Sequence, residues 1–380
     1  MKAALIVDFH GSSGGDFVNI IIIKALVAKG FHVDIYTSTE EKLIEAYSSF
    51  EENIPRKTRI IGIKTILPNP YSIYFILKKI RNLNDYDVVI LNDDVPKNLN
   101  NIKSMIYIHF PHAARVKYNV LVERKYTDSG IGWIKWQLHR RLFPHYFHVD
   151  GSFQSDRIFL TNSTLTEFWT KKLWPNAQIK ILYPPVQAKK IIKKTNKSVN
   201  PKKNQIVYVG RIMPDKGIED IIMAISYISN AKVKLLGPVD NHNYLKKLKR
   251  LIKKYNLERK VELKGKLPRD KLLDVLIESK VIVHPAPLEP FGIAVVEGMA
   301  AGCIPIVKRG FNGPWVDILK RREKNGYAYS DIDELTVKIL QAMNNNLDTT
   351  KVQTCAMQFD EEHFINTFTR FLESLEFSTA

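Results

Sequence analysis

Short apolar runs alternate with longer amphipathic segments along the first half of the chain. Runs with the length of a buried strand stand at residues 2–8, 31–37, 87–92, 104–110, 157–163 and 179–185. Between the first two runs, residues 17–30 have the longer apolar pattern of a helix that ends at Gly30. Strands that alternate with helices favour a parallel sheet that is covered on both faces.

The second half of the chain repeats this alternation. Strand-like runs stand at residues 205–210, 232–237, 260–265, 281–285 and 303–307. Helical patterns fall between them, and an amphipathic helix at 360–375 has no strand after it. The lysine-rich segment 186–204 has little apolar pattern and predicts an interdomain linker. A basic nucleic-acid arm is the alternative, but no aromatic residue is interleaved there for base stacking.

The pattern therefore predicts an α/β protein with two parallel-sheet domains. We expect the following division: a first domain at 1–185, the linker at 186–204, a second domain at 205–355 and a C-terminal helix at 356–380 that crosses back to the first domain. Two such halves would place a ligand cleft between them, at the carboxyl ends of the strands.

The net charge of the chain indicates which kinds of partner it attracts, but it does not bear on the fold. The chain has 57 Lys and Arg against 39 Asp and Glu, so its formal net charge is +18. Such a surface attracts nucleic acid, phosphorylated substrates or an acidic membrane face. Cys303 and Cys355 form neither a metal-ligand nor a redox spacing, which fits a reducing cytosol. The first residues lack the architecture of a signal peptide, and no apolar stretch reaches the roughly 18 residues of a membrane-spanning helix.

Two glutamates frame the segment EPFGIAVVE between two predicted strands of the second half. Glu289 stands in the loop after a strand, and Glu297 stands inside the helix that the segment predicts. The start of that helix presents backbone N–H groups around Phe291, Gly292 and Ile293, and such a terminus binds anions. A nucleotide sugar needs a carboxylate, a diphosphate cradle and a second carboxylate. Alternatively, Glu289 only complements the helix dipole and Glu297 is a surface residue.

A second motif, GRIMPDKGIEDII at 210–222, follows a strand and opens a helix. It brings Gly210, Arg211 and Lys216 to the same predicted edge of the sheet. Two cations there would stabilise the charge that develops as a bond to a leaving diphosphate breaks. The alternative is a strand-turn-helix whose cations face solvent.

With these motifs the sequence resembles the family-four retaining glycosyltransferases. That family has the GT-B fold, in which two Rossmann-like parallel-sheet domains face each other across a cleft. In the second half the resemblance rests on GR…DKG, LLGP (235–238), VELKGKLP (261–268) and EPFGIAVVEGMAAGCIPIV. In the first half it rests on GG before the first helix, IYIHFPH, TNST and LYPPV. With NGPWVDIL (312–319), several of these are similar to the α-1,2-mannosyltransferases that extend dolichol-linked oligosaccharides on the cytosolic membrane face.

The resemblance implies roles for matching positions. Glu289 would contact the transferred sugar, Glu297 would bind the ribose, and Arg211 with Lys216 would bind the diphosphate. The implied catalytic set is Glu289, His109, Arg211 and Lys216. The other implied donor-binding positions are Gly15, Gly210, Gly265, Lys266, Leu267, Phe291, Gly292, Ile293 and Glu297.

The first half supplies the remaining candidates. His109, in IYIHFPH, ends an apolar strand and would reach the donor sugar, with His112 as a nearby competitor. Gly14 and Gly15 would lie under the diphosphate and leave room for the acceptor. The family often has Glu-Arg after the glycine pair, whereas this chain has Asp16, which leaves the acceptor open. The candidates for acceptor contacts are Gly14, Asp16, His112 and Asp93.

Two further segments bear on whether the protein binds a metal ion and whether it contacts a membrane. The sequence DYD at 85–87 is a literal D-x-D metal motif, but it directly precedes a strand and is interpreted as a turn, so no metal is expected. Segment 118–149 mixes aromatic and basic residues in a way that suits a membrane interface. The alternative is a helix packed on its own domain. The residues concerned are Trp133, Trp136, Leu138, Leu142, Phe143, Lys135, Arg140 and Arg141.

These features predict a retaining enzyme that moves mannose or glucose from GDP-mannose or UDP-glucose to a glycan acceptor linked to a polyprenyl or dolichol lipid. It would use no metal and no specific nucleic acid, and it would be cytoplasmic, bound peripherally to the anionic cytosolic face of a membrane. Retention implies front-face attack or a double displacement, and the sequence leaves both open. One rival is a UDP-sugar-dependent glycosyltransferase with a soluble acceptor. A distant rival is a nucleic-acid-binding protein, which gives no reason for Glu289 and Glu297.

Overall fold

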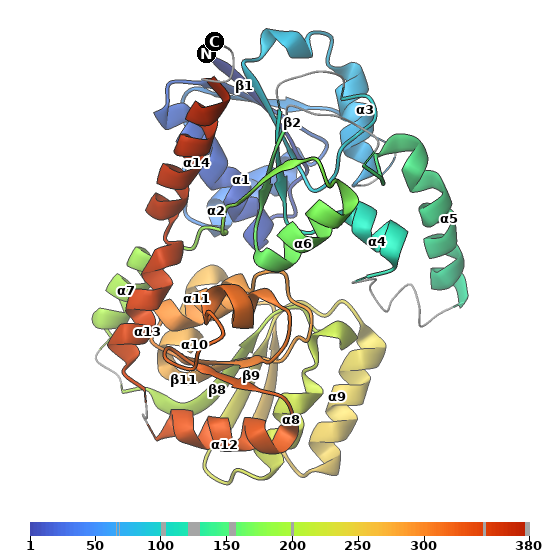
Figure 1. Ribbon diagram of the computed structural model, residues 1–380. Helices are drawn as coiled ribbons and strands as arrows, with labels where there is room; N and C mark the ends of the chain where they lie inside the picture. The colour runs from blue at the N-terminus through green and yellow to red at the C-terminus, as the bar shows by residue number, and fades with distance from the viewer. Residues whose placement is uncertain are drawn as a thin grey trace. The chain divides into compact units, whose positions relative to one another are not determined.

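The chain forms two compact units, each with a sheet flanked by helices (Figure 1). One unit is Met1–Pro185 with Glu361–Ala380, and the other is Val186–Asp360. The computed structural model describes residues 1–65, 67, 69–99, 104–120, 130–151, 157–198, 201–344 and 347–376.

The first unit is built on a sheet that has the strand order β3-β2-β1-β4-β5-β6-β7 among its described residues. All of these strands pair in parallel. The order reverses between β1 and β4, which is the Rossmann arrangement. The strands are β1 (Lys2–Ile6), β2 (His32–Thr37), β3 (Thr58–Gly62), β4 (Val88–Asn92), β5 (Ser104–Ile108), β6 (Ile158–Thr161) and β7 (Gln178–Ile181).

The helices of this unit bury apolar faces on the sheet. They are α1 (Gly14–Ala28), α2 (Glu40–Ser49), α3 (Tyr71–Lys79), α4 (His112–Tyr118), α5 (Gly130–Tyr146), α6 (Thr164–Leu173) and α14 (Glu361–Glu376). A capping box of Ser13 and Asp16 starts α1, and its isoleucine run is fully buried. The C-terminal helix α14 packs on α1 through Phe364, Phe368 and Leu372, which belong to the same core as α1.

The second unit has a sheet with the order β10-β9-β8-β11-β12-β13 among its described residues, and its strands also pair in parallel. The strands are β8 (Lys203–Val209), β9 (Lys232–Leu236), β10 (Val261–Gly265), β11 (Ser279–His284), β12 (Ile304–Lys308) and β13 (Tyr327–Tyr329). The helices are α7 (Ala188–Asn196), α8 (Glu219–Ser226), α9 (His242–Lys254), α10 (Arg269–Glu278), α11 (Ile293–Ala300), α12 (Ile332–Met343) and α13 (Thr349–Ala356). The two units confirm the predicted α/β class with two Rossmann-like domains.

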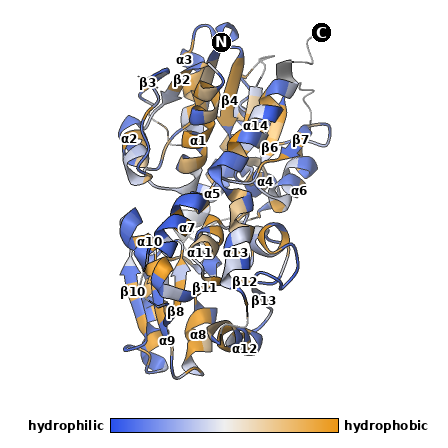
Figure 2. Ribbon diagram, turned by 90° about the vertical axis from the view of Figure 1, so that its left-hand side faces the viewer, coloured by the Kyte–Doolittle hydropathy of each residue, from blue (hydrophilic) through white to orange (hydrophobic). Residues whose placement is uncertain are grey.

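The segment 186–204, which the sequence suggested to be a linker, contains helix α7 and the start of β8. Ile191 is fully buried, while the lysines around it face outward, so α7 is hydrophilic in colour in Figure 2. The segment is therefore part of the second unit.

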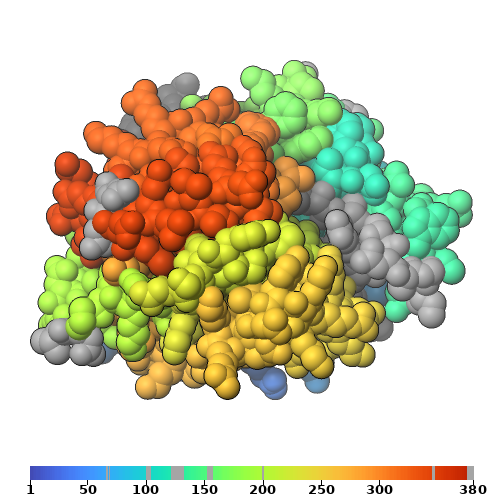
Figure 3. Space-filling model, turned by 90° about the horizontal axis from the view of Figure 1, so that it is seen from below, coloured from blue at the N-terminus to red at the C-terminus, as the bar shows by residue number. Residues whose placement is uncertain are grey.

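The surface of the second unit carries much of the positive charge. Helix α9 buries Tyr244, Leu248 and Ile252 and exposes its cations, and Figure 3 shows this segment on the surface in gold. The exposed cations of α9 are Lys246, Lys247, Lys249, Arg250, Lys253 and Lys254. Among the described residues, no helix combines the length and the hydropathy that crossing a membrane requires.

Candidate functional site

Three charged or polar side chains meet at the carboxyl ends of β8 and β11 in the second unit. The Lys216 Nζ atom lies 2.8 Å from Glu289 Oε2, and His284 Nε2 lies 3.2 Å from the same oxygen. A carboxylate oxygen can only accept, so the Nε2 atom of His284 carries the proton in this contact. Strands β8 and β11 are neighbours, which is why residues far apart in sequence converge here.

The neighbours of Glu289 fix its charge. Burial alone would raise its pKa, but the Lys216 charge and the His284 hydrogen bond outweigh burial, so the pKa lies well below its usual range. Only 17% of the Glu289 side chain and 12% of the Lys216 side chain are exposed. Glu289 is therefore an ionised carboxylate at neutral pH, in a largely buried position.

Local backbone geometry brings this pair together. Lys216 ends a short 3-10 turn, and Gly217 follows it with a φ of +63°. A Cβ atom on Gly217 would lie 2.9 Å from the Pro285 carbonyl oxygen, so a side chain there would push the Lys216 turn away from the loop after β11. The close approach of these two loops therefore depends on glycine.

The loop after Glu289 turns sharply into α11. Gly292 is the N-cap residue and has a φ of +95°, and no side chain caps the helix. The Glu289 carbonyl accepts a hydrogen bond from the Gly313 N–H at 2.8 Å, which holds the loop. Phe291 is buried, and Ile293 is the first residue of α11. The helix start thus offers backbone N–H groups beside the Glu289 carboxylate.

Glu297 lies within α11 and is buried against a cation. Its Oε1 atom lies 2.5 Å from the Arg269 Nη1 atom at the start of α10. Only 9% of the Glu297 side chain is exposed. Glu297 is thus an ion-paired carboxylate and not the surface residue of the alternative hypothesis. A ribose that bound here would meet Arg269 as well.

The glycine-rich strand ends lie side by side at this edge of the sheet. The Gly237 N–H donates to the Gly265 carbonyl at 2.9 Å, and a Cβ on Gly237 would overlap the Gly210 carbonyl. Lys266 and Leu267 follow β10 and are exposed and half-buried, respectively. Gly210 follows β8 and Gly265 ends β10, with β9 between these two strands. The donor-binding roles of Gly210 and of the segment 265–267 stay predictions.

Arg211 has a different partner from Lys216. Its Nη1 atom lies 3.2 Å from Asp240 Oδ2, and the side chain is 44% exposed. Its carbonyl accepts from the Tyr208 hydroxyl at 2.9 Å, and the Tyr208 ring stacks on His284. Arg211 therefore stands at the rim of the site, and the diphosphate role assigned to it stays a prediction.

In the first unit, His109 lies against the start of α1. A Cβ on Gly15 would lie 3.3 Å from His109 Cε1, so glycine lets the imidazole approach the helix terminus. The Nε2 atom of His109 is buried without a hydrogen-bond partner among the described residues. Burial lowers the pKa of His109, although the charges of Asp93 and Asp16 oppose that shift. A neutral imidazole beside a helix N-terminus can donate to or accept from a ligand there.

Asp93 and Asp16, the acidic candidates of the first unit, accept hydrogen bonds from backbone N–H groups. Asp93 Oδ1 accepts from the N–H groups of His109 and Phe110, at 2.7 and 3.1 Å, and thereby fixes the His109 loop. Asp16 is buried and accepts from the N–H of Ser13 and the N–H of His10, at 2.8 and 2.9 Å. Gly14 is the first residue of α1. The predicted contacts of these residues with the glycan acceptor stay predictions. Asp16 caps the start of α1.

His112 points into an aromatic cluster. Its Nε2 atom lies 2.6 Å from His139 Nε2, and His139 Nδ1 lies 2.9 Å from the Tyr71 hydroxyl. Burial lowers the pKa of both imidazoles. These contacts give His112 a packing role within the first unit. Of the segment 118–149, residues 121–129 lie outside the described part of the chain.

Sequence reasoning missed three partners of the predicted residues: His284, Arg269 and Tyr208. His284 ends the strand before Glu289, and its imidazole could have been suspected because it closes an apolar run at the predicted edge. Arg269 and Tyr208 carry no local signal, since their roles come from packing across the sheet. Within the described ranges, no group of three or more His, Cys, Asp and Glu residues has a geometry that could hold a metal ion.

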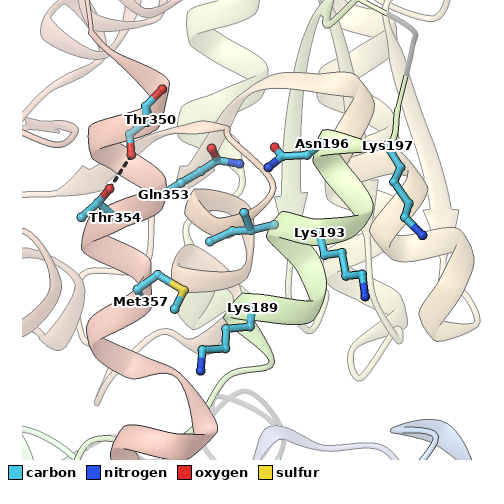
Figure 4. A pocket seen from close by; sticks show the side chains of 9 residues that line it. Lys189, Lys193, Asn196, Lys197, Thr350, Gln353, Thr354 and Met357 are labelled. Atoms are coloured by element: carbon cyan, nitrogen blue, oxygen red, sulfur yellow. Dashed lines mark hydrogen bonds between the residues drawn. The ribbon is translucent and has the colours of Figure 1, made fainter.

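A separate cavity of about 600 Å³ lies between α7 and α13 (Figure 4). Lys189 and Lys193 on α7 and Lys197 directly after it line the cavity at four-residue spacing. Thr354 on α13 donates to the Thr350 carbonyl at 2.9 Å. None of the predicted site residues lines this cavity. The predicted site residues therefore lie outside this cavity.

Comparison with known proteins finds a family that matches the second unit. Residues 189–356 match the family described as Glycosyl transferases group 1. The match covers nearly all of the second unit, Val186–Asp360. Lys216, Glu289 and Glu297 all lie within the matched residues, so the resemblance seen in the sequence is confirmed at family level.

Two curated relatives have the same name, GDP-Man:Man(3)GlcNAc(2)-PP-Dol alpha-1,2-mannosyltransferase. The one from Dictyostelium discoideum is 26% identical over 299 residues, which are 71% of this chain and 58% of the relative. The one from Candida glabrata is 28% identical over 248 residues, which are 60% of this chain and 48% of the relative. The chain thus spans about half the length of the curated relatives that it matches.

A solved structure shares the fold over the whole chain. Sucrose-phosphate synthase from Thermosynechococcus elongatus superposes with a TM-score of 0.71 and 17% sequence identity, and the match covers 100% of both chains. This likeness confirms the predicted GT-B fold class of two Rossmann-like parallel-sheet units.

Proposed function

We propose that the chain is a retaining hexosyltransferase that moves a sugar from a nucleotide diphosphate donor to a glycan acceptor. The observation that carries this proposal is the contact of Glu289 with Lys216 and His284 beside the start of α11. The cluster lies within the residues that match the group 1 glycosyltransferase family, at the carboxyl ends of parallel strands, where α/β sheets bind ligands.

The diphosphate of the donor would bind between Lys216 and the N–H groups at the start of α11, with Arg211 at the rim. A unit charge pair at about 4 Å and an effective dielectric of about 20 is worth roughly 4 kcal/mol. These groups would stabilise the negative charge that develops on the diphosphate as its bond to the sugar breaks. No metal is needed in this proposal, because Lys216 and the helix terminus supply the positive charge.

Glu289 would hold the hydroxyls of the transferred sugar or the positive charge that develops on its ring. The ion pair with Lys216 keeps Glu289 ionised for that task. Glu297, oriented by Arg269, would accept hydrogen bonds from the ribose. His109, beside Gly15 in the first unit, would meet the donor sugar from that unit.

We further propose that the sugar is mannose, that the donor is GDP-mannose and that the acceptor is a dolichol- or polyprenyl-linked glycan. The names of the Dictyostelium and Candida relatives support this choice. The enzyme would work in the cytoplasm, bound peripherally to the anionic cytosolic face of a membrane. The formal net charge of +18 supports contact with that surface.

A transfer assay tests this proposal. Purified protein is incubated with GDP-mannose or UDP-glucose and with either a dolichyl-diphosphate-linked oligosaccharide or a water-soluble glycan, and glycan extension is measured. We expect extension of the lipid-linked glycan from GDP-mannose, with retained anomeric configuration. Glu289→Ala should abolish it, while Glu258→Ala, at an exposed position outside the cluster, should not. Near-normal extension by Glu289→Ala would refute the site, and extension only of the soluble glycan from UDP-glucose would refute the substrate.

A further inference from the structure

Helix α5 presents a row of large apolar side chains to solvent. Ile134, Leu138 and Leu142 stand four residues apart and share one helix face. They are 62%, 56% and 42% exposed, and Trp133, on another side of the same helix, is 54% exposed. We call Ile134, Leu138 and Leu142 the α5 stripe. The opposite face of α5 is buried through Trp136 and Phe143, so the helix is anchored while the α5 stripe has no cover from the described residues.

The density of the α5 stripe is unusual for this chain. Elsewhere among the described residues, exposed large apolar side chains on helices stand singly or in pairs, such as Phe168 on α6 and the pair Val337 and Leu340 on α12. Single exposed apolar residues are normal on a protein surface. A contiguous apolar group rimmed by polar residues marks an interaction site instead.

Cations flank the α5 stripe. Lys135 and Arg141 are exposed on the same helix. A cavity of about 410 Å³ lies where α5 packs beside α4. Its lining includes three cations and one carboxylate: Lys117, Arg140, Arg141 and Asp150. The Arg140 Nε atom donates to the Val116 carbonyl at 3.1 Å, which holds that guanidinium at the cavity.

We propose that the α5 stripe docks on an anionic lipid bilayer, with the cavity beside it taking a lipid phosphate group. The apolar side chains would enter the boundary between headgroups and acyl chains, and the cations would lie at the depth of the phosphates. Charge complementarity favours this occupant. The centre of a protein–protein interface is depleted in charge, whereas here a basic cavity adjoins the stripe.

This inference rests on the proposed function in one respect, because it names the surface through which the enzyme would reach a lipid-linked acceptor. Vesicle binding needs no sugar donor, so the two can fail separately. A chain that binds vesicles without transferring a sugar contradicts only the proposed function. A chain that transfers a sugar without binding vesicles contradicts the docking surface and the proposed membrane binding, but not the proposed sugar transfer.

The test is flotation of the full chain with vesicles of phosphatidylcholine alone or of phosphatidylcholine mixed with phosphatidylglycerol. We expect binding to the mixed vesicles that weakens as salt is raised. Leu138→Ser with Leu142→Ser should lower the partition coefficient roughly tenfold or more. Lys117→Gln with Arg141→Gln should lower it roughly 25-fold, about fivefold for each cation.

The matched control is Val337→Ser with Leu340→Ser, which removes two exposed apolar residues from α12 and should leave vesicle binding unchanged. Thermal melts verify that every variant is folded. Equal flotation of the α5 stripe variant and the wild type would overturn the proposal. So would a dimer in size-exclusion chromatography that the α5 stripe variant abolishes, because the stripe would then be covered by a second copy.

Discussion

The Lys216 ammonium lies 2.8 Å from the Glu289 carboxylate, although the two residues follow different strands. The pair forms because β8 and β11 are neighbours and because Gly217 lets the two loops approach closely. Glu289 thereby keeps its negative charge in a largely buried position. The site thus combines an ionised, ion-paired carboxylate with the start of helix α11.

His284 is expected to act as a positioning residue for Glu289. His284→Ala removes the hydrogen bond to Glu289 Oε2, so the pKa of Glu289 should rise and the rate of donor hydrolysis should fall about tenfold or more. The acid limb of the pH–rate profile should move to higher pH. His284→Gln, which keeps an N–H donor, should recover much of the rate. A merely structural role would lower the melting temperature without moving the profile or being rescued by Gln.

Gly292 is expected to be required by the turn into α11. Its φ is +95°, and an added Cβ would lie 2.8 Å from Pro314 Cγ. Gly292→Ala should therefore destabilise its unit by about 1–3 kcal/mol from backbone strain, plus the cost of the clash. Gly30→Ala is the matched control, because Gly30 has a φ of +89° but nothing within 4 Å of an added Cβ. Equal losses in urea denaturation of the two variants would contradict the packing argument.

The lowered pKa of Glu289 predicts a pH dependence of stability. A carboxylate whose pKa is lower in the folded state stabilises the fold above its ordinary pKa of 4.5, and that stabilisation is lost as the pH falls below this value. Glu289→Gln mimics the protonated form. The wild type should exceed this variant in melting temperature at neutral pH, and the gap should narrow in acid. A gap that stays constant below pH 4.5 would show that Glu289 does not titrate as described.

Sugar transfer is expected to proceed without a divalent metal. Lys216 and the start of α11 supply positive charge at the proposed diphosphate site. Addition of EDTA, followed by gel filtration into metal-free buffer, should leave the rate of donor hydrolysis unchanged. A loss that added Mg²⁺ or Mn²⁺ restores would contradict this prediction.

The sequence could predict the alternation of strands and helices because buried parallel strands are continuous apolar runs, as in β4 and β5. It could not predict β13, whose three residues have no pattern of their own and are placed by pairing with β12. Helix α7 was missed because its many lysines leave only a short apolar pattern, around the buried Ile191.

The candidate site, too, could be predicted from the sequence only in part. Glu289 and Lys216 stand in motifs that are visible locally, so they could be named from the sequence. Their ion pair could not be predicted, because it depends on which strands are neighbours. Arg269 was missed for this reason too, since it reaches Glu297 from another helix.

The most direct test of the central claim is a calorimetric titration of GDP and UDP into the wild type, Lys216→Ala and the surface control Lys247→Ala. Lys247 is 58% exposed and pairs with Glu219 away from the cluster. If Lys216 and the start of α11 bind a nucleoside diphosphate, the wild type and the control should bind GDP alike. Lys216→Ala should bind GDP about tenfold or more weakly. Equal affinity in Lys216→Ala, or no binding of either nucleotide by the wild type, would contradict the account.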